Sequence, residues 1–138
     1  MTTIREALPA DRPATIGLWE SCGLTRPWND PGLDFDRAVA GATSAVLVAV
    51  DEDGVVEGSA MVGADGHRGW VYYLAVRPDR RGRGLGRTVM AAAEAWLRDA
   101  GMPKLELMVR ADNAEAHRFY DALGYESSDV VVRQTWLA

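Results

Sequence analysis

The residue types that point most clearly to chemistry lie in the segment 76–87. Three glycines are spaced two positions apart there, at Gly82, Gly84 and Gly86. The same segment carries five arginines, which are Arg77, Arg80, Arg81, Arg83 and Arg87. A glycine-rich turn at the start of a helix exposes several backbone N–H groups to one anion, and the helix dipole adds positive potential. Because the chain is otherwise acidic, the segment predicts a local site for a phosphate-bearing ligand, with a diphosphate as its natural occupant.

Two other kinds of phosphate loop do not fit this segment. No Gly-Lys-Ser/Thr sequence follows the glycines, so the segment is not a Walker loop. A Rossmann fingerprint requires an early strand in a parallel fold and an acidic residue about 20 positions on. Taken alone, the glycines are also typical of a plain tight turn, and the arginines of a solvated face.

Apolar periodicity predicts the elements that must hold this segment. The predicted strands are 4–7, 45–50, 55–63, 70–76, 104–109 and 130–136. The predicted helices are one through Ile16, Trp19 and Cys22, a weak one over 34–40, a long one from Leu85 to Ala100, and one from an Asp112-x-x-Glu115 capping box to Leu123. Strands followed by a strand–helix–strand order indicate an α/β fold. We expect a mixed sheet, largely antiparallel with one parallel pair, and helices on both faces.

Length and charge limit the classes of protein. The 138 residues suit a single domain spanning 1–138, and the net charge of −5 argues against a general nucleic-acid surface. The single cysteine, Cys22, excludes an intramolecular disulfide, and no Cys/His spacing indicates a structural zinc site. The first residues lack a signal-peptide pattern, and no long apolar run indicates a membrane span. We therefore expect a cytoplasmic protein without membrane or nucleic-acid partners.

Two motifs carry a family resemblance. Residues 81–86 read Arg-Gly-Arg-Gly-Leu-Gly after Val76-x-Pro78, and Asn113 precedes Tyr120 by seven positions, ahead of Leu-Gly-Tyr at 123–125. This sequence resembles the GNAT family of acetyl-CoA-dependent N-acetyltransferases, whose pyrophosphate motif is Gln/Arg-x-x-Gly-x-Gly/Ala. The resemblance covers essentially the whole chain and implies a GNAT-type fold. The loop 24–31 and the turn 65–69 resemble, more narrowly, small bacterial members typified by YpeA.

The resemblance implies where acetyl-CoA binds. In GNAT folds the strand before the phosphate loop bulges and splays from the next parallel strand, and the pantetheine arm lies in the opening. The residues that the resemblance assigns to acetyl-CoA are Leu74, Ala75, Val76, Arg81, Gly82, Arg83, Gly84, Leu85, Gly86, Arg87, Asn113 and Tyr120. No metal is implied.

Acetyl transfer to an amine requires a group that protonates the departing thiolate. The resemblance assigns this general acid to Tyr120, and a phenol with a reference pKa of about 10 is protonated at neutral pH. The alternative is that Tyr120 only packs in the core, where Phe119 and Leu123 already supply an apolar helix face. Asn113 is expected to order the helix start and the pantetheine, and it can at the same time be a plain N-cap.

The group that deprotonates the amine is less clear. Members that acetylate protein N-termini commonly carry a glutamate five positions before the motif asparagine, where this chain has Met108. Glu106 lies on the same face of the predicted strand and is the candidate base, although it can equally be a solvated residue. Further candidates near the opposite lip of the sheet are Tyr72, Tyr73, Asp65 and His67. A water chain suffices for an α-amine of pKa about 8, whereas a lysine near 10.4 needs more help.

The acceptor amine is expected at the loop between the first two helices, where GNAT acceptor pockets are usually built. The candidate acceptor-binding residues are Arg26, Trp28, Asn29 and Asp30 on that loop, together with Tyr72. An alternative for Trp28 is a hydrophobic staple that closes the two helices. The sequence thus favours an N-acetyltransferase that moves an acetyl group to a small-molecule or peptide amine. The alternative is a non-catalytic acyl-CoA binding module, and the last strand leaves a homodimer possible.

Overall fold

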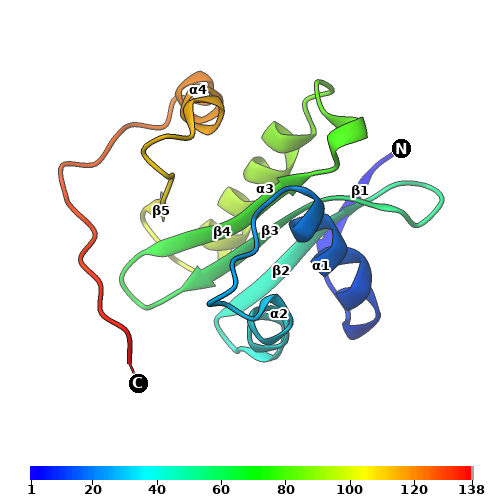
Figure 1. Cartoon of the computed structure of the whole chain (residues 1–138), viewed down its shortest axis with the longest axis horizontal. Coiled ribbons are helices and arrows are strands. Elements are labelled where there is room, and N and C mark those ends of the chain that lie inside the picture. Colours follow the sequence, from blue (N-terminus) through cyan, green and yellow to red (C-terminus); the bar gives the residue numbers. More distant parts are fainter. Residues whose placement is uncertain (138) are drawn as a thin grey trace. The chain divides into compact units, whose positions relative to one another are not determined.

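The computed structural model describes residues 1–137 of the chain. They divide into two compact units, Met1–Met108 and the part that begins at Val109. The first unit contains a five-stranded sheet and three α-helices, and the second contains one α-helix, α4 (Figure 1). No helix among the described residues is long and apolar enough to cross a membrane.

The sheet of the first unit follows the chain order β1-β2-β3-β4-β5. Its strands are β1 (Thr3–Glu6), β2 (Ser44–Val50), β3 (Val56–Ala64), β4 (Gly69–Val76) and β5 (Leu105–Leu107). Neighbours pair antiparallel except β4 and β5, which are parallel. The prediction of a mixed, mostly antiparallel sheet is confirmed. The last of these strands is shorter than the predicted 104–109.

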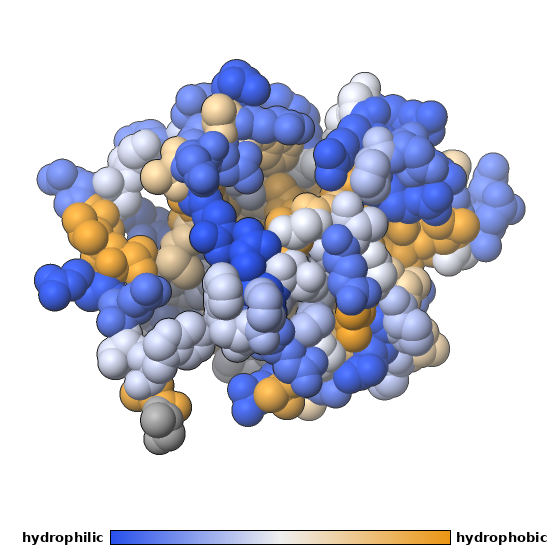
Figure 2. Space-filling model, in the orientation of Figure 1, coloured by the Kyte–Doolittle hydropathy of each residue, from blue (hydrophilic) through white to orange (hydrophobic). Residues whose placement is uncertain are grey.

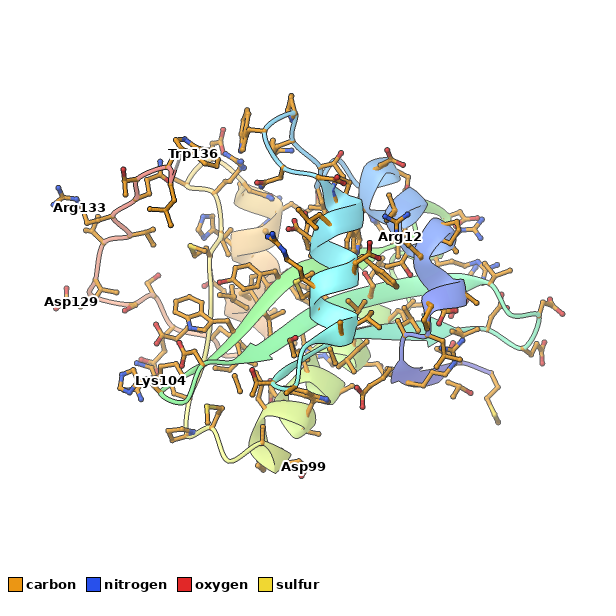
Figure 3. All side chains as sticks on the ribbon, turned by 90° about the horizontal axis from the view of Figure 1, so that it is seen from below. Arg12, Asp99, Lys104, Asp129, Arg133 and Trp136 are labelled. Carbon is orange, nitrogen blue, oxygen red and sulfur yellow. The ribbon has the colours of Figure 1, made fainter. Side chains whose placement is uncertain are left out.

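Helices cover both faces of this sheet (Figures 1 and 3). One face carries α1 (Arg12–Ser21), which follows the 3₁₀ turn η1 (Pro9–Asp11), and α2 (Pro31–Ala40). The other face carries α3 (Leu85–Asp99). Trp19 and Phe35 are fully enclosed on the first face, where they pack with Val46 and Val48 of β2. This burial of large apolar side chains holds the helices on the strands.

The long helix α3 packs closely on the sheet at Gly69. A Cβ on Gly69 would lie 2.7 Å from Leu97, whereas a Cβ on Gly58 would lie 3.2 Å from the Ala75 carbonyl and in ordinary contact with Val89. Val89 and Leu97 belong to the apolar face that the sequence periodicity predicts for this helix. The predicted helix end is confirmed, because Gly101 follows with a positive φ of 82°.

The strand β4 carries a bulge in its pairing with β3. Ser59 faces Ala75 and Met61 faces Tyr72, so Ala60 alone faces two residues of β4. These two residues are 73 and 74. Tyr73 is the only non-glycine residue of the described chain with a positive φ, at 53°. A bulge of this kind bends the strand and changes which face its side chains occupy.

In the second unit, α4 (Ala114–Ala122) begins at Asn113, whose side chain accepts a hydrogen bond from the N–H of Ala116 at 3.1 Å. The predicted capping box at Asp112 is therefore wrong by one residue. Asn113 is the N-cap because its side-chain oxygen accepts a hydrogen bond from an N–H group of the first turn.

The predicted strand 130–136 is wrong, because this segment has no regular secondary structure. Val130, Val131 and Val132 are 71%, 82% and 60% exposed, and Figure 2 shows apolar surface over this part of the chain, at the left. Figure 3 labels Asp129, Arg133 and Trp136 along the same extended segment. A strand exists only when a neighbour pairs with its backbone, and β-branched composition by itself does not supply that neighbour.

Candidate active site

The start of α3 offers unpaired backbone donors. Its N-cap is Gly84, which has a φ of 77° and no side chain to accept a bond from the first turn. By contrast, Asp30 caps α2 and Asn113 caps α4 through their side chains. Gly82 also has a positive φ, of 80°, and no heavy atom lies within 4 Å of a Cβ built on either glycine. The loop therefore leaves open space in front of free N–H groups and a helix dipole, which is the arrangement that binds phosphates.

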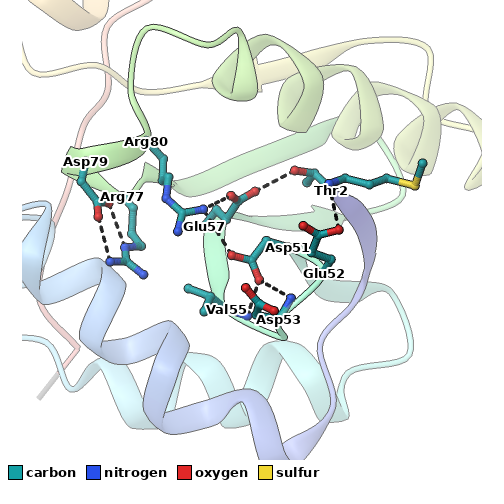
Figure 4. Close-up of polar contacts among 10 residues, drawn as sticks. Thr2, Asp51, Glu52, Asp53, Val55, Glu57, Arg77, Asp79 and Arg80 are labelled. Atoms are coloured by element: carbon teal, nitrogen blue, oxygen red, sulfur yellow. Dashed lines mark hydrogen bonds and ion pairs between the residues drawn. The ribbon is translucent and has the colours of Figure 1, made fainter.

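Two of the five arginines near this loop are engaged with carboxylates (Figure 4). Arg77 pairs with Asp79 at 2.9 Å, and Arg80, in the 3₁₀ turn η2 (Pro78–Arg80), pairs with Glu57 and with Asp51 at 3.2 Å. These two arginines are not among the residues assigned to acetyl-CoA. Arg77 pairs with a carboxylate two residues away, whereas the partners of Arg80 lie more than 20 residues away in the sequence.

The carboxylates of Asp51 and Glu57 line a cleft of about 600 Å³ that also touches Arg83 and Leu85. Glu57 is almost completely buried there, and its second oxygen accepts a hydrogen bond from Thr2 at 2.7 Å. Hydrogen bonds from the N–H groups of Val55 and Asp53, together with Arg80, hold the pKa of Asp51 below its usual range. Through Asp51 and Glu57, Arg80 links η2 to the β2–β3 turn and to β3.

The three remaining arginines differ in their contacts. Arg81 donates from Nε to the carbonyl of Val76 at 3.3 Å, and its Nη2 lies 3.6 Å from the Cys22 sulfur. Arg83 and Arg87 are exposed and form no ion pair within the described residues. These two guanidinium groups thus supply free positive charge beside the start of α3.

Beyond its first three residues, β4 has a free edge. Pairing with β5 joins only Gly69–Val71 to Leu105–Leu107. From Tyr72 to Val76 the described chain pairs β4 only with β3. The backbone groups of Leu74, Ala75 and Val76 lie on this stretch, so a ligand with amide groups can bind here as an added strand. The splayed pair implied by the family resemblance is present.

Tyr72 of β4 and Glu106 of β5 differ in their contacts. The Tyr72 side chain is 41% exposed and stacks on Trp70 at a centroid distance of 6.4 Å, and burial, then the nearby Asp65, raises its pKa. The carboxylate of Glu106 lies 3.6 Å from the Arg68 guanidinium. The carboxylate of this candidate base is thus engaged in an ion pair.

The loop between α1 and α2 uses most of its polar groups locally. Arg26 donates to the carbonyls of Gly23 and Thr25 at 2.8 and 2.9 Å, and Asp30 accepts from the first-turn N–H groups of α2. The N–H of Asn29 donates to the Arg26 carbonyl. Trp28 is 59% exposed, so it is no buried staple between the helices. Its exposed ring is therefore open to contact with an acceptor.

Tyr120 belongs to the second unit. Its ring packs edge-on against Phe119 at 5.0 Å and lies 5.6 Å from Tyr125. Burial raises the pKa of Tyr120 to about 12, so the phenol stays protonated throughout the neutral range. Asn113 lies at the start of the same helix.

Sequence reasoning missed a set of residues around Tyr73. This tyrosine stacks on Trp19 at 3.9 Å, donates a hydrogen bond to Asp34 at 2.7 Å and holds the positive φ of the bulge. Burial, then the bond to Asp34, raises its pKa above the usual value. A positive φ at a non-glycine residue has no signal in a single sequence, because tertiary contacts impose it.

A glycine-rich loop at an open helix start, beside a splayed parallel strand pair, defines an acetyltransferase of the GNAT type. The chain belongs to this family, because residues 6–125 match the model of the acetyltransferase (GNAT) family. Curated relatives include an acetyltransferase of Yersinia enterocolitica, 43% identical over 94% of this chain and 91% of the relative. Another is an acetyltransferase of Pectobacterium atrosepticum, 46% identical over 88% of this chain and 85% of the relative.

Solved structures share the fold. The aminoglycoside N-acetyltransferase AAC(6')-Iy, in complex with the bisubstrate analog CoA-S-monomethyl-acetylneamine, superposes with a TM-score of 0.85 over 100% of this chain and 99% of its own, at 18% identity. The ribosomal-protein-alanine N-acetyltransferase of Escherichia coli superposes with a TM-score of 0.79 over 93% of this chain and 79% of its own, at 25% identity. These neighbours acetylate different kinds of acceptor by their names, so the shared fold leaves the acceptor of this chain open.

Proposed function

We propose that this acetyltransferase moves the acetyl group of acetyl-CoA to a primary amine by direct attack in a ternary complex. The observation that carries the proposal is the start of α3, where Gly82 and Gly84 adopt positive φ and leave the first-turn N–H groups open. Family membership and the CoA complex of a structural neighbour support coenzyme A as the anion that binds there.

The residues present fit this ligand at two places. The space in front of Gly82 and Gly84 is free of side chains, which suits a diphosphate, and Arg83 and Arg87 add unpaired positive charge. The free edge of β4 from Tyr72 to Val76 suits the two amides of a pantetheine arm. Leu85 and Gly86 contribute backbone N–H groups, and Asn113 is proposed to order the helix near the pantetheine.

When bound, acetyl-CoA supplies a thioester whose carbonyl carbon accepts an amine, with the coenzyme A thiolate as leaving group. Tyr120 is the proposed proton donor to that sulfur, because it is the tyrosine of the family motif seven positions after Asn113 and its phenol is protonated at neutral pH. Arg81 holds the Val76 carbonyl and so fixes the end of β4 next to the loop. Trp28 and Tyr72 are proposed to contact the acceptor, with Arg26, Asn29 and Asp30 shaping the loop around it.

Deprotonation of the amine is proposed to run through water, because the Glu106 carboxylate is engaged in an ion pair with the Arg68 guanidinium at 3.6 Å. An α-amine, with a pKa of about 8, has a usable neutral fraction without a strong base. This favours α-amines and other amines of low pKa as acceptors.

The test is a panel of primary amines incubated with purified protein and acetyl-CoA, with release of free thiol as the readout. We expect turnover with at least one amine and binding of CoA by calorimetry. If CoA binds but no amine releases thiol, the protein is an acyl-CoA binding module, and the enzymatic proposal is wrong. If ATP or NAD binds as well as desulfo-CoA, the loop is a general nucleotide site and the pantetheine assignment is wrong.

A further inference from the structure

The bulge in β4 lies where the strand leaves its parallel neighbour. Pairing with β5 ends at Val71, and the bulge, residues 73 and 74 opposite Ala60, begins two residues later. One extra residue in a strand reverses which backbone N–H and C=O groups face each side beyond it. The bulge therefore decides which groups of Leu74, Ala75 and Val76 face the free edge.

The bulge also turns two successive side chains to one face of the sheet. Tyr72 shares the face of its partner Met61, which packs against the core beneath α1 and α2. Tyr73 packs against the same core and stacks on Trp19, with 3.9 Å between ring centroids and 11° between planes. A regular strand would place these neighbours on opposite faces, so Tyr73 can reach Trp19 only while the bulge persists.

A buried hydroxyl ties this bulge to α1. Ser59 on β3 is fully buried, accepts a hydrogen bond from the Trp19 indole N–H at 2.9 Å, and donates to the carbonyl of Tyr73 at 3.3 Å. Both hydrogen bonds involve the Ser59 hydroxyl, which takes no part in the backbone pairing of β3 with β4. Ser59 thus satisfies the indole N–H and the Tyr73 carbonyl together, and the carbonyl would lose this partner if the strand straightened.

The side chain of Tyr73 also connects the bulge to α2. The Tyr73 hydroxyl donates to the carboxylate of Asp34 at 2.7 Å. Asp34 lies in the first turn of α2, directly after the loop that contains Trp28. Tyr73 is thus held at its carbonyl, its ring and its hydroxyl, by three different elements, in a backbone conformation that a tyrosine rarely adopts.

We propose that Ser59, Trp19 and Asp34 are positioning residues that lock the β4 bulge and thereby set the backbone groups that receive the pantetheine arm of acetyl-CoA. The proposal rests on the proposed function for its ligand, whereas the lock itself is a property of the free protein. It also connects the acceptor loop to the coenzyme edge, because Asp34 follows that loop and holds Tyr73.

The test compares two buried hydroxyl deletions, Ser59→Ala and Thr15→Val. Thr15, on α1, is also fully buried, but its hydroxyl has no hydrogen-bond partner within the described residues, so its removal controls for the loss of a buried polar atom. In the free protein, the backbone chemical shifts and the three-bond amide–α-proton coupling of Tyr73 report whether φ is positive. Calorimetry with desulfo-CoA then reports affinity on the folded protein.

We expect Ser59→Ala to shift Tyr73 toward an extended φ and to weaken desulfo-CoA binding by about five- to tenfold, the effect of roughly one lost hydrogen bond. Thr15→Val should leave both unchanged. Tyr73→Phe, which keeps the stacking on Trp19, and Asp34→Ala should weaken binding in the same direction, whereas Asp34→Asn retains an acceptor and should restore it.

A positive φ at Tyr73 with affinity within twofold of wild type in Ser59→Ala would overturn the lock. If Ser59→Ala does not fold, Tyr73→Phe decides the question, since wild-type affinity in that variant overturns the tie to α2. Failure of the proposed function looks different. In that case the wild-type protein binds no desulfo-CoA, while the NMR comparison of Ser59→Ala with Thr15→Val still reports on the bulge.

Discussion

The substitution Gly84→Ala separates phosphate binding from folding. Gly84 caps α3 with a φ of 77°, and the added Cβ would project into open space. An L-residue in this left-handed conformation costs about 1–2 kcal/mol of unfolding free energy. Gly101 is the matched control, because it follows the opposite end of α3, has a φ of 82° and also faces open space. Gly101→Ala therefore carries the same backbone strain without touching the phosphate loop.

Both variants should melt about 4–8 °C below the wild type, as expected for that loss in a domain of this size. Only Gly84→Ala should lose coenzyme A, because its methyl group takes the space where the proposed phosphates meet the N–H groups. One lost hydrogen bond to a charged group is worth about 1.5–3 kcal/mol, which raises Kd about 10- to 100-fold. Calorimetry with CoA below the melting range measures this difference.

Two outcomes would refute the reasoning. If Gly84→Ala binds CoA as the wild type does, the phosphates do not lie against this helix start. If Gly101→Ala loses as much affinity as Gly84→Ala, the loss comes from strain in α3 and not from the ligand contact. Gly84→Val should enlarge the affinity difference, since a branched side chain fills more of the same space.

Further predictions concern the acid and the packing of the sheet. Tyr120→Phe should lower kcat by about 10- to 1,000-fold with little change in CoA affinity, and unchanged kcat would exclude Tyr120 as the acid. Since the protonated phenol is needed and burial raises its pKa to about 12, kcat should show no alkaline loss from Tyr120 between about pH 8 and pH 10. A falling limb near pH 10 that disappears in Tyr120→Phe would contradict this. Gly69→Ala should reduce the unfolding free energy by about 1–3 kcal/mol in urea titrations, because its Cβ meets Leu97 at 2.7 Å. Gly63→Ala, on β3 with no atom within 4 Å of the new Cβ, is its control and should stay within about 0.5 kcal/mol of the wild type.

Element types followed from the sequence where the periodic signal was strong. The long helix from Leu85, its end at Gly101 and the three central strands are all present at or near the predicted residues. Each of these depends on local periodicity and on glycine at a helix end, which a single sequence displays directly. The segment 130–136 has the composition of a strand but no regular structure, because strand formation needs a partner backbone that composition does not specify.

The open helix start that is proposed to bind phosphate could likewise be predicted from the sequence, since glycines at alternate positions precede an amphipathic helix. The pairing of Arg80 was decided by tertiary structure, because its partners Glu57 and Asp51 lie far along the chain. The bulge at Tyr73 was decided in the same way, by contacts from α1, α2 and β3. Local sequence sets what a backbone segment favours by itself, whereas charge pairing and strain depend on which distant groups the fold brings within a few ångströms.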